Sequence, residues 1–342
     1  GKVFTMITRI IYVTFTFELI GAVLIYFSVD NTLFGSTLEA IFFALFHSVS
    51  AFCNAGFSTF SLGLNDPQLK FNYTLHIWLT LLGGLGFPIV FNFFSWLRIK
   101  LINMTNHLLK NEVHISPVRV IQINSKLAMI TSLFLLIFGF VGYLFFEQQA
   151  TLQQHPTWWG KIVTSFFGAV TPRTAGFNTV DLSVFTMPTV MLYLLLMWIG
   201  ASPGSTGGGI KTTTFAVAVL NLLSILKGKK RTEVFRTQVS EHSINKAFAI
   251  MVMSLLIIGL AILIMSLEDA EHGIMKLAFE VFSAFSTVGL TLGITPSLSV
   301  TSKIVLIAVM FIGRVGALTF FIAFMVQVKN SAYRYPEEEI MY

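Results

Sequence analysis

The sequence reads S-A-F-C-N-A-G-F-S-T at residues 50–59, V-T-P-R-T-A-G-F-N-T at 170–179 and S-A-F-S-T-V-G-L-T-L at 283–292. In each stretch, small and hydroxyl-bearing residues lead to a single glycine, which is Gly56, Gly176 or Gly289. The glycines are 120 and 113 residues apart, and each lies between a shorter apolar segment and a longer one. Self-similarity at a regular interval is the signature of an internal repeat. The sequence therefore predicts three copies of one structural unit.

The composition is typical of a protein that lies in lipid. Hydrophobic residues make up 55% of the 342 residues and charged residues only 11%, against about 25% charged residues in ordinary soluble domains. The 35 phenylalanines and five tryptophans give more apolar surface than a soluble fold of this length can bury, whereas a bilayer solvates it. The single cysteine, Cys53, excludes a disulfide framework or a thiolate metal cluster within the chain.

Six apolar segments are long enough to cross a membrane. They are residues 5–27, 73–97, 126–146, 187–223, 245–267 and 301–326. Between the members of each successive pair lies a shorter apolar stretch of 14 to 16 residues, at 37–52, 158–171 and 273–286. Because these stretches are too short to cross, we expect re-entrant half-helices. The predicted fold is an all-α integral membrane protein of repeated helix–pore loop–helix units.

The charged loops predict how the chain lies in the membrane. Most of the 22 Lys and Arg residues lie in segments 98–126 and 224–246 and near the two ends of the chain. The other loops are mainly acidic, with Asp30, Asp66, Glu147, Asp181, Glu268, Asp269 and Glu271. By the positive-inside rule we expect a multi-pass protein of the cell membrane, with both visible termini cytoplasmic and the glycine stretches toward the outside. These loops account for the net charge of +6, and we expect no nucleic-acid partner.

A re-entrant segment that ends on a glycine is suited to binding a bare cation. Backbone at membrane depth is tolerated only where it is buried in protein or lines a water-filled cavity. There its carbonyl groups can replace the hydration shell of the ion. Glycine permits positive φ and a close approach of the backbone to the ion. The alternative is that Gly56, Gly176 and Gly289 are ordinary helix-end glycines, but three at matched positions favour a selectivity filter.

The fourth apolar segment contains G-A-S-P-G-S-T-G-G-G-I-K-T-T-T at residues 200–214. Its glycines and proline cannot continue a helix, and residues 187–223 are far longer than one span. We therefore expect two half-helices joined by an irregular loop, which can act as a movable barrier. A phosphate-binding loop is excluded because one residue too many precedes Lys211 and no strand comes before the motif.

Three positive charges, Arg173, Lys211 and Arg314, lie where charge is expensive. Arg314 lies in the middle of the last spanning segment without an acid at helical spacing, so its expected partners are carbonyl groups of the glycine-rich loop. It either controls a gate or ties helices together, and the five fixed donors of arginine suit both roles. We expect Arg173 to brace the filter from behind, because a permanent cation that faced the pore would repel a transported cation.

Several of these motifs resemble the Trk/Ktr/HKT superfamily of potassium transporters. They are the A-G-F triplets at 55–57 and 175–177, T-P-R-T-A-G-F-N-T at 171–179 and S-T-V-G-L-T at 286–291. The C-terminal Y-P-E-E-E-I at 335–340 is most similar to the bacterial KtrB branch. The resemblance implies four helix–pore loop–helix repeats in a potassium-channel-like pseudo-fourfold arrangement. The three visible copies resemble the second, third and fourth, so we expect that the first repeat is missing from this sequence.

The resemblance also implies roles for particular residues and partners. The visible repeats are expected at 1–110, 111–235 and 236–342. K⁺ is expected at the filter residues Asn54, Ala55, Gly56, Thr174, Ala175, Gly176, Thr287, Val288 and Gly289. Gating is expected from Gly204, Gly207, Gly208, Gly209, Lys211 and Arg314. The family further implies a homodimer in contact with membrane lipids and a cytoplasmic nucleotide-binding ring of the KtrA/RCK type. ATP or ADP is then expected only on that separate subunit, and no organic cofactor in this chain.

Other kinds of function stay open at this point. An inverted-repeat secondary carrier coupled to Na⁺ or H⁺ also uses broken helices, although the repeats here all run in the same sense. A sodium-preferring member of the same family is a second alternative, because one glycine per stretch gives fewer constrained carbonyl rings than T-V-G-Y-G loops. A receptor or scaffold without transport would leave the repeated stretch unexplained. The sequence shows no nucleophile–base constellation and no metal motif, so we do not expect an enzyme.

Overall fold

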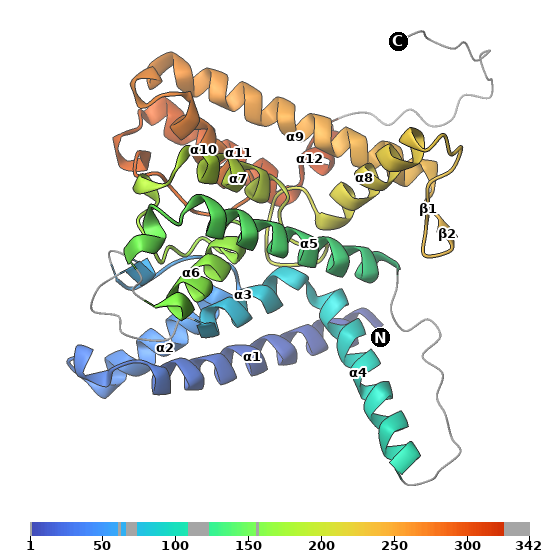
Figure 1. Ribbon diagram of the computed structural model, residues 1–342, viewed down its shortest axis with the longest axis horizontal. Coiled ribbons are helices and arrows are strands. Elements are labelled where there is room, and N and C mark those ends of the chain that lie inside the picture. Colours follow the sequence, from blue (N-terminus) through green and yellow to red (C-terminus); the bar gives the residue numbers. More distant parts are fainter. Residues whose placement is uncertain (1, 61–62, 66–73, 109–122, 155–156, 325–342) are drawn as a thin grey trace.

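The computed structural model describes residues 2–60, 63–65, 74–108, 123–154 and 157–324, and these are mostly helical (Figure 1). The α-helices of the described part are α1 (Lys2–Ser28), α2 (Thr37–Phe52), α3 (Thr74–Leu85), α4 (Phe87–Leu108), α5 (Ile123–Phe146), α6 (Trp158–Val170), α7 (Met187–Trp198), α8 (Thr212–Leu226), α9 (Glu241–Glu268), α10 (Ile274–Phe285), α11 (Val300–Val315) and α12 (Ala317–Phe324). Strands β1 (Glu233–Val234) and β2 (Thr237–Gln238) form one antiparallel hairpin. Short 3₁₀ turns lie at Asn31–Leu33, Gly63–Asn65, Thr151–Gln154, Leu182–Val184, Ala270–His272 and Thr295–Ser297.

The helices repeat in the order long helix, short helix, broken helix. Each long helix, α1, α5 or α9, packs on the short helix that follows it, α2, α6 or α10. A broken pair then completes each unit, namely α3 with α4, α7 with α8 and α11 with α12. The re-entrant stretches predicted at 37–52, 158–171 and 273–286 are confirmed as short helices that end next to the three glycines. The all-α fold of repeated units predicted from the sequence is thereby confirmed.

The starts of two short helices are fixed by side-chain caps. At α2, the Ser36 hydroxyl accepts from the Glu39 backbone N–H at 3.3 Å, and the Glu39 carboxylate accepts from the Gly35 N–H at 2.8 Å. At α6, the Thr157 hydroxyl accepts from the Gly160 N–H at 3.1 Å. Such caps contribute about 1 kcal/mol each to helix stability. They set where each short helix begins and therefore where it ends beside its glycine.

The third apolar segment of each unit is broken, although the sequence predicted a break only in residues 187–223. That break is confirmed, because α7 ends at Trp198 and α8 begins at Thr212. The segments at 73–97 and 301–326, which the sequence predicted to be long enough to span, also contain breaks that the sequence analysis did not predict. The helix is interrupted at Gly86, with φ of +80°, and at Gly316, with φ of +94°. Glycine adopts this left-handed conformation without the steric penalty that other residues incur.

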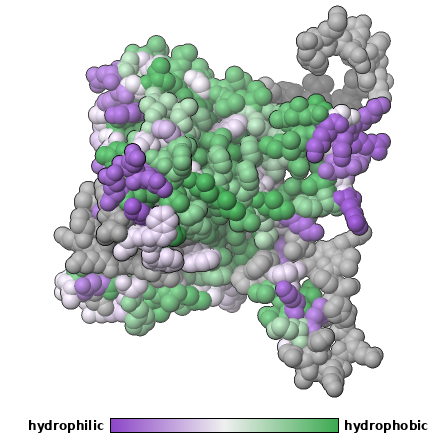
Figure 2. Space-filling view, viewed as in Figure 1, coloured by the Kyte–Doolittle hydropathy of each residue, from purple (hydrophilic) through white to green (hydrophobic). Residues whose placement is uncertain are grey.

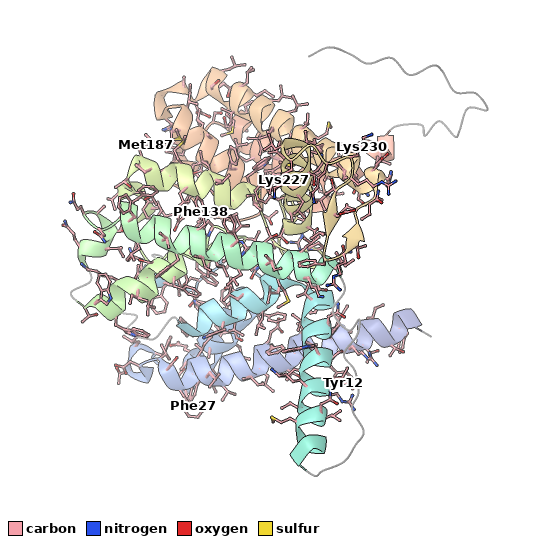
Figure 3. The ribbon with its side chains drawn as sticks, turned by 45° about the vertical axis from the view of Figure 1, so that its right-hand side comes forward. Tyr12, Phe27, Phe138, Met187, Lys227 and Lys230 are labelled. Carbon is pink, nitrogen blue, oxygen red and sulfur yellow. The ribbon has the colours of Figure 1, made fainter. Side chains whose placement is uncertain are left out.

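Three described helical stretches are long and apolar enough to cross a membrane, namely Ile7–Ser28, Ile123–Phe146 and Glu241–Glu268. A fourth is obtained if Trp78–Leu85 and Ile89–Thr105, which meet at 98°, are counted as one span. Hydrophobic surface covers the middle of the molecule (Figure 2). Tyr12 and Phe27 on α1 lie on its outer face, with exposed fractions of 71% and 79% (Figure 3). Apolar surface of this extent is stable in contact with lipid rather than water.

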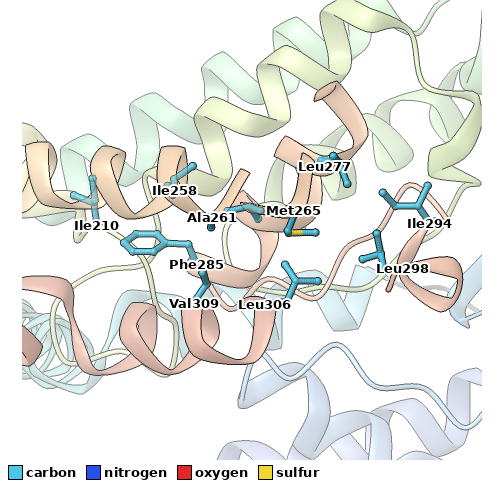
Figure 4. Packing of buried hydrophobic residues seen from close by; sticks show 11 residues of the cluster. Ile210, Ile258, Ala261, Met265, Leu277, Phe285, Ile294, Leu298, Leu306 and Val309 are labelled. Atoms are coloured by element: carbon cyan, nitrogen blue, oxygen red, sulfur yellow. The ribbon is translucent and has the colours of Figure 1, made fainter. Parts of the chain in front are cut away.

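The third unit has its own hydrophobic core (Figure 4). Long helix α9, short helix α10 and the first half of the broken helix, α11, all contribute to it. Its labelled members are Ile210, Ile258, Ala261, Met265, Leu277, Phe285, Ile294, Leu298, Leu306 and Val309. Ile210 comes from the preceding unit, because it belongs to the loop that joins α7 to α8. The end of that loop is therefore anchored in the core of the third unit.

The two ends of the molecule carry different elements. The turns between α1 and α2, between α5 and α6 and between α9 and α10 lie at one end, on the left of Figure 1. The start of α1 and the β1–β2 hairpin lie toward the other end, and Lys227 and Lys230 lie there beside α8 (Figure 3). This separation agrees with the charge pattern of the loops. The motif at 335–340 and the basic residues of 109–122 and 325–342 lie outside the described residues.

Candidate functional site

The three glycine stretches, residues 50–59, 170–179 and 283–292, share one backbone conformation. Gly56, Gly176 and Gly289 have φ of +71°, +78° and +87°. The residue two positions earlier is also left-handed in every case, with φ of +52° at Asn54, +74° at Thr174 and +53° at Thr287. A left-handed conformation costs a non-glycine residue roughly 1–2 kcal/mol. The same strained turn is therefore built three times, and strain of this kind is characteristic of binding sites.

The glycine stretches contact one another in series along an arc. A Cβ built on Gly56 would lie 2.7 Å from the Ala175 carbonyl oxygen, and one built on Gly176 would lie 2.1 Å from the Val288 carbonyl oxygen. The Asn54 side-chain amide also hydrogen-bonds the Thr174 hydroxyl, at 3.1 Å. Backbone thus meets backbone with no space for a side chain between. A Cβ on Gly289 would have no atom within 4 Å, so the arc is open on that side in the part of the chain that the structure describes.

Side chains behind the arc hold two of the stretches in place. The Ser50 hydroxyl donates to the Phe57 carbonyl at 2.8 Å, and the Thr171 hydroxyl donates to the Phe177 carbonyl. Arg173 is only 9% exposed, and its guanidinium donates to the Ser132 carbonyl at 3.2 Å and the Ser132 hydroxyl at 3.1 Å. The Arg173 charge is therefore directed at α5.

The loop that joins α7 to α8, residues 199–211, is called the central loop from here on. It lies against the start of two glycine stretches. The Gly208 N–H donates to the Thr287 hydroxyl at 3.0 Å. A Cβ on Gly207 would lie 2.3 Å from the Thr174 hydroxyl oxygen, so a side chain there would collide with it. The glycines let the central loop approach the stretches this closely.

The central loop is also bonded to the first unit, at the break between α3 and α4. The Ser202 N–H donates to the Gly84 carbonyl at 3.1 Å. In return, the Phe87 N–H donates to the Gly204 carbonyl at 3.3 Å. With the Thr287 bond, these contacts join the central loop to all three units.

Two of the predicted charged residues bind carbonyl groups of the central loop. The Lys211 ammonium donates to the Gly207 carbonyl at 2.6 Å, and the Arg314 guanidinium donates to the Thr206 carbonyl. The expected contact of Arg314 with a loop carbonyl is present, but its expected place in mid-helix is wrong. Arg314 lies in the last turn of α11, because the helix stops before Gly316. In the described part of the chain, the ion pair is that of His272 with Glu271. Neither Lys211 nor Arg314 therefore forms an ion pair with an acid among the described residues.

Sequence reasoning missed two glycines that let the helices within a unit pack closely. A Cβ on Gly83 would lie 1.9 Å from the Phe52 carbonyl oxygen, and one on Gly313 would lie 1.8 Å from the Phe285 carbonyl oxygen. The first half of each of these two broken helices therefore presses against the carboxyl end of its short helix. The sequence signal was a glycine inside the apolar segment after each glycine stretch, which also fits ordinary helix packing.

The fold and this arrangement define a class. Three units of one topology bring short apolar helices together with strained, glycine-containing backbone, an arrangement that suits helical membrane proteins that form ion pathways. The chain belongs to the TrkH family of cation transport proteins, whose family model matches residues 1–334.

Individual relatives agree with this family. The chain is 35% identical over 309 residues to the potassium/sodium uptake protein NtpJ of Enterococcus hirae, which covers 89% of this chain and 64% of the relative. It is 36% identical to the Ktr system potassium uptake protein B of Bacillus subtilis, over 88% of this chain and 64% of the relative. The corresponding protein of Vibrio alginolyticus is also 36% identical, over 88% and 62%. The chain thus spans slightly less than two thirds of the length of these relatives.

A solved structure shares the fold. The crystal structure of the potassium transporter TrkH from Vibrio parahaemolyticus matches with a TM-score of 0.69 at 19% sequence identity. The match covers 95% of this chain and 65% of that chain. The resemblance to the family that the sequence motifs indicated is therefore confirmed.

Proposed function

We propose that this chain forms three sides of a potassium pathway in an uptake protein of the cell membrane. The observation that carries this proposal is the arc in which three matching strained turns meet backbone to backbone. Family membership and relatives named for potassium uptake support the same ion. The three repeats proposed at 1–110, 111–235 and 236–342 each supply one turn, and the last boundary falls in the turn between β1 and β2.

In this proposal the glycine stretches form the selectivity filter. K⁺ binds the backbone of Asn54, Ala55, Gly56, Thr174, Ala175, Gly176, Thr287, Val288 and Gly289. Carbonyl groups there replace the water that the ion leaves behind. The alternation of positive and negative φ along each stretch supports this role, because it allows successive carbonyls to face one direction. Close packing of Gly56 on Ala175 and of Gly176 on Val288 sets the spacing of those carbonyls.

The central loop is the proposed gate. Gly204, Gly207, Gly208 and Gly209 give its backbone freedom to move, while Lys211 and Arg314 bind two of its carbonyl groups. Fixed positive charge near the ion path adds an electrostatic barrier to a cation. A loop in this position blocks the path on one side of the filter. Opening then requires the loop to leave Thr287 and the α3–α4 break together.

A pathway fits the topology better than an inverted-repeat carrier does. The long helices α1, α5 and α9 all run from the hairpin end toward the opposite end (Figure 1). Inverted repeats would alternate in direction. A sodium-preferring protein of the same architecture is the remaining candidate, favoured by the relative named for both potassium and sodium uptake.

The partners are proposed from the same family. A homodimer in the cell membrane, surrounded by lipid and controlled by a cytoplasmic nucleotide-binding ring of the KtrA/RCK type, would present its basic end to that ring. Relatives named as parts of a Ktr system support a multi-component complex. ATP or ADP would act on the ring, with potassium as the ion bound by this chain.

The test is transport by the complete protein in proteoliposomes, with K⁺ and Na⁺ supplied separately. Gly56→Ser, Gly176→Ser and Gly289→Ser each place a side chain in the proposed filter, so each is expected to lower the preference for K⁺. An unchanged K⁺/Na⁺ ratio in all three variants would remove the filter assignment. A transport rate that saturates with K⁺ concentration and is coupled to a second ion would favour the inverted-repeat carrier.

A further inference from the structure

The position nine residues before each glycine carries a different chemical group in each unit. These residues are His47 on α2, Phe167 on α6 and Glu280 on α10, so an imidazole, a phenyl ring and a carboxylate occupy one register. All three are buried, with exposed fractions of 0%, 3% and 5%. Two of the three can form hydrogen bonds, and both are bonded to the chain segment just after their glycine.

Glu280 binds the segment that follows Gly289. The Thr291 hydroxyl donates to one carboxylate oxygen of Glu280 at 2.5 Å, and the Thr295 hydroxyl donates to the other at 2.8 Å. The Thr291 oxygen in turn accepts from the Gly293 backbone N–H at 2.9 Å. The segment is thus tied to the short helix α10 by a chain of bonds that runs from N–H to hydroxyl to carboxylate.

His47 makes the matching connection in the first unit. Its Nδ1 lies 3.0 Å from the Phe43 carbonyl, which can only accept, so Nδ1 carries the proton and Nε2 is the acceptor. The Ser58 hydroxyl lies 3.0 Å from Nε2 and accepts from the Phe60 N–H at 3.1 Å. Ser58 and Phe60 follow Gly56 by two and four residues, the offsets at which Thr291 and Gly293 follow Gly289.

We propose that Glu280 and His47 are positioning residues of the filter, which fix the backbone after Gly289 and Gly56 through the hydroxyls of Thr291 and Ser58. This inference rests on the proposed filter. It adds that hydrogen-bond relays from short helices α2 and α10 brace the first and third units, whereas the matching position of α6, Phe167, carries no hydrogen-bonding group in its side chain.

Glu280 has the larger role. A carboxylate accepts a shorter and stronger hydrogen bond than a neutral imidazole does. In addition, Gly56 and Gly176 pack directly on the next stretch, whereas a Cβ on Gly289 would meet no atom of the described chain. The backbone around Gly289 therefore depends more on restraint from its own short helix, α10.

The test measures K⁺ and Na⁺ uptake affinities for the complete protein with its partners. Glu280→Ala and Thr291→Val each cut the relay, so each is expected to lower the K⁺/Na⁺ preference about tenfold, which corresponds to about 1.4 kcal/mol. The double variant should be no worse than either single one. Glu280→Gln should restore the preference, because its amide oxygen accepts from Thr291 and its NH₂ group donates to Thr295. Glu271→Ala, an exposed acid of the preceding turn, is the matched control.

Three results would overturn the proposal. Equal loss in Glu280→Gln and Glu280→Ala would mean that charge matters rather than position. Additive losses in the double variant would mean that the two residues act independently. Wild-type preference in Thr291→Val, while Gly289→Ser loses preference, would remove the relay and leave the filter intact. Thr291→Val keeps the side-chain volume, so it decides the matter even where Glu280→Ala does not fold. Ser58→Ala cuts the relay from the neutral His47 imidazole, and it is expected to lower the K⁺/Na⁺ preference less than Thr291→Val does.

Discussion

The strongest quantitative expectation concerns what a methyl group does at each glycine of the proposed filter, Gly56, Gly176 and Gly289. Gly176→Ala would force a left-handed residue at φ of +78° and a Cβ 2.1 Å from the Val288 carbonyl oxygen. At Gly56 the corresponding contact is 2.7 Å, to the Ala175 carbonyl oxygen, and at Gly289 there is none within 4 Å. The conformational cost of roughly 1–2 kcal/mol is common to all three. Only the steric clash of the new Cβ distinguishes the three variants. The contacted atoms at Gly56 and Gly176 are backbone carbonyl oxygens, which cannot move away as a flexible side chain can.

The expected order of damage is therefore Gly176→Ala, then Gly56→Ala, then Gly289→Ala. A displaced Val288 carbonyl would change the proposed ion site itself, so Gly176→Ala should lose K⁺/Na⁺ preference by about tenfold or more, which is about 1.4 kcal/mol. The assay is competitive uptake of K⁺ and Na⁺ in proteoliposomes, with thermal unfolding in detergent as the measure of stability. Gly259→Ala is the control, because a Cβ there meets no atom within 4 Å and Gly259 lies within helix α9.

The ranking is what makes the experiment decisive. If Gly289→Ala lost as much K⁺/Na⁺ preference as Gly176→Ala, the left-handed strain alone would set the loss. Gly176→Ala with unchanged preference and unchanged stability would show that Val288 does not lie against Gly176, and the arc would be wrong.

Three further expectations concern the proposed gate, the basic end and the turn that follows α5. Arg314→Ala, or a deletion within 204–209, should raise maximal flux in proteoliposomes and change apparent K⁺ affinity much less; loss of affinity at constant maximal rate would place the central loop in the binding site instead. Charge reversal at Lys227, Lys229, Lys230 and Arg231 should weaken pull-down of the nucleotide-binding ring while the membrane subunit stays folded, and unaffected pull-down would favour anionic lipid as the partner of this cluster. Burial raises the pKa of Glu147, directly after the carboxyl end of α5, but hydrogen bonds from Thr189, Thr186 and Thr151 outweigh it and hold this pKa below its ordinary value of 4.5. The ionised Glu147 therefore stabilises the fold fully above pH 4.5, and this stabilisation is lost as pH falls through the pKa of Glu147 in the folded state. Glu147→Gln should lower thermal stability at pH 7 and flatten its dependence on acid pH. The same acid dependence in the variant and the wild type would show that Glu147 does not supply this stabilisation.

Some of this architecture was predictable from local sequence. The short helices follow from apolar stretches that are too short to cross a membrane. The break in 187–223 follows from a run of glycines with a proline, which no helix accommodates. Both signals lie within a few residues of the feature that they predict.

The breaks at Gly86 and Gly316 were not predictable in the same way. Each is a single glycine in an apolar segment, and a single glycine is tolerated in a helix at a cost of about 1 kcal/mol. At Gly86 the helix breaks where the Phe87 N–H bonds the Gly204 carbonyl, more than a hundred residues away. The contacts of the arc were not predictable either. The spacing of the glycines along the sequence does not show that Gly176 lies against Val288 in space.

If the central loop is the proposed gate, its position also gives a distant partner a route to the proposed filter. It continues directly into α8, which runs from Thr212 to Leu226 and ends at the basic cluster that starts with Lys227. A helix of this length is stiff and spans about 1.5 Å per residue, so a displacement at Lys227 is carried to Lys211 and the loop. The loop's bonds to Gly84, Phe87 and Thr287 each contribute about 1 kcal/mol, and they belong to different units. Breaking them together costs a few kcal/mol, which is the size of gap that a binding partner can shift. The geometry therefore favours a gate with two discrete states, controlled through α8, over a loop that moves gradually.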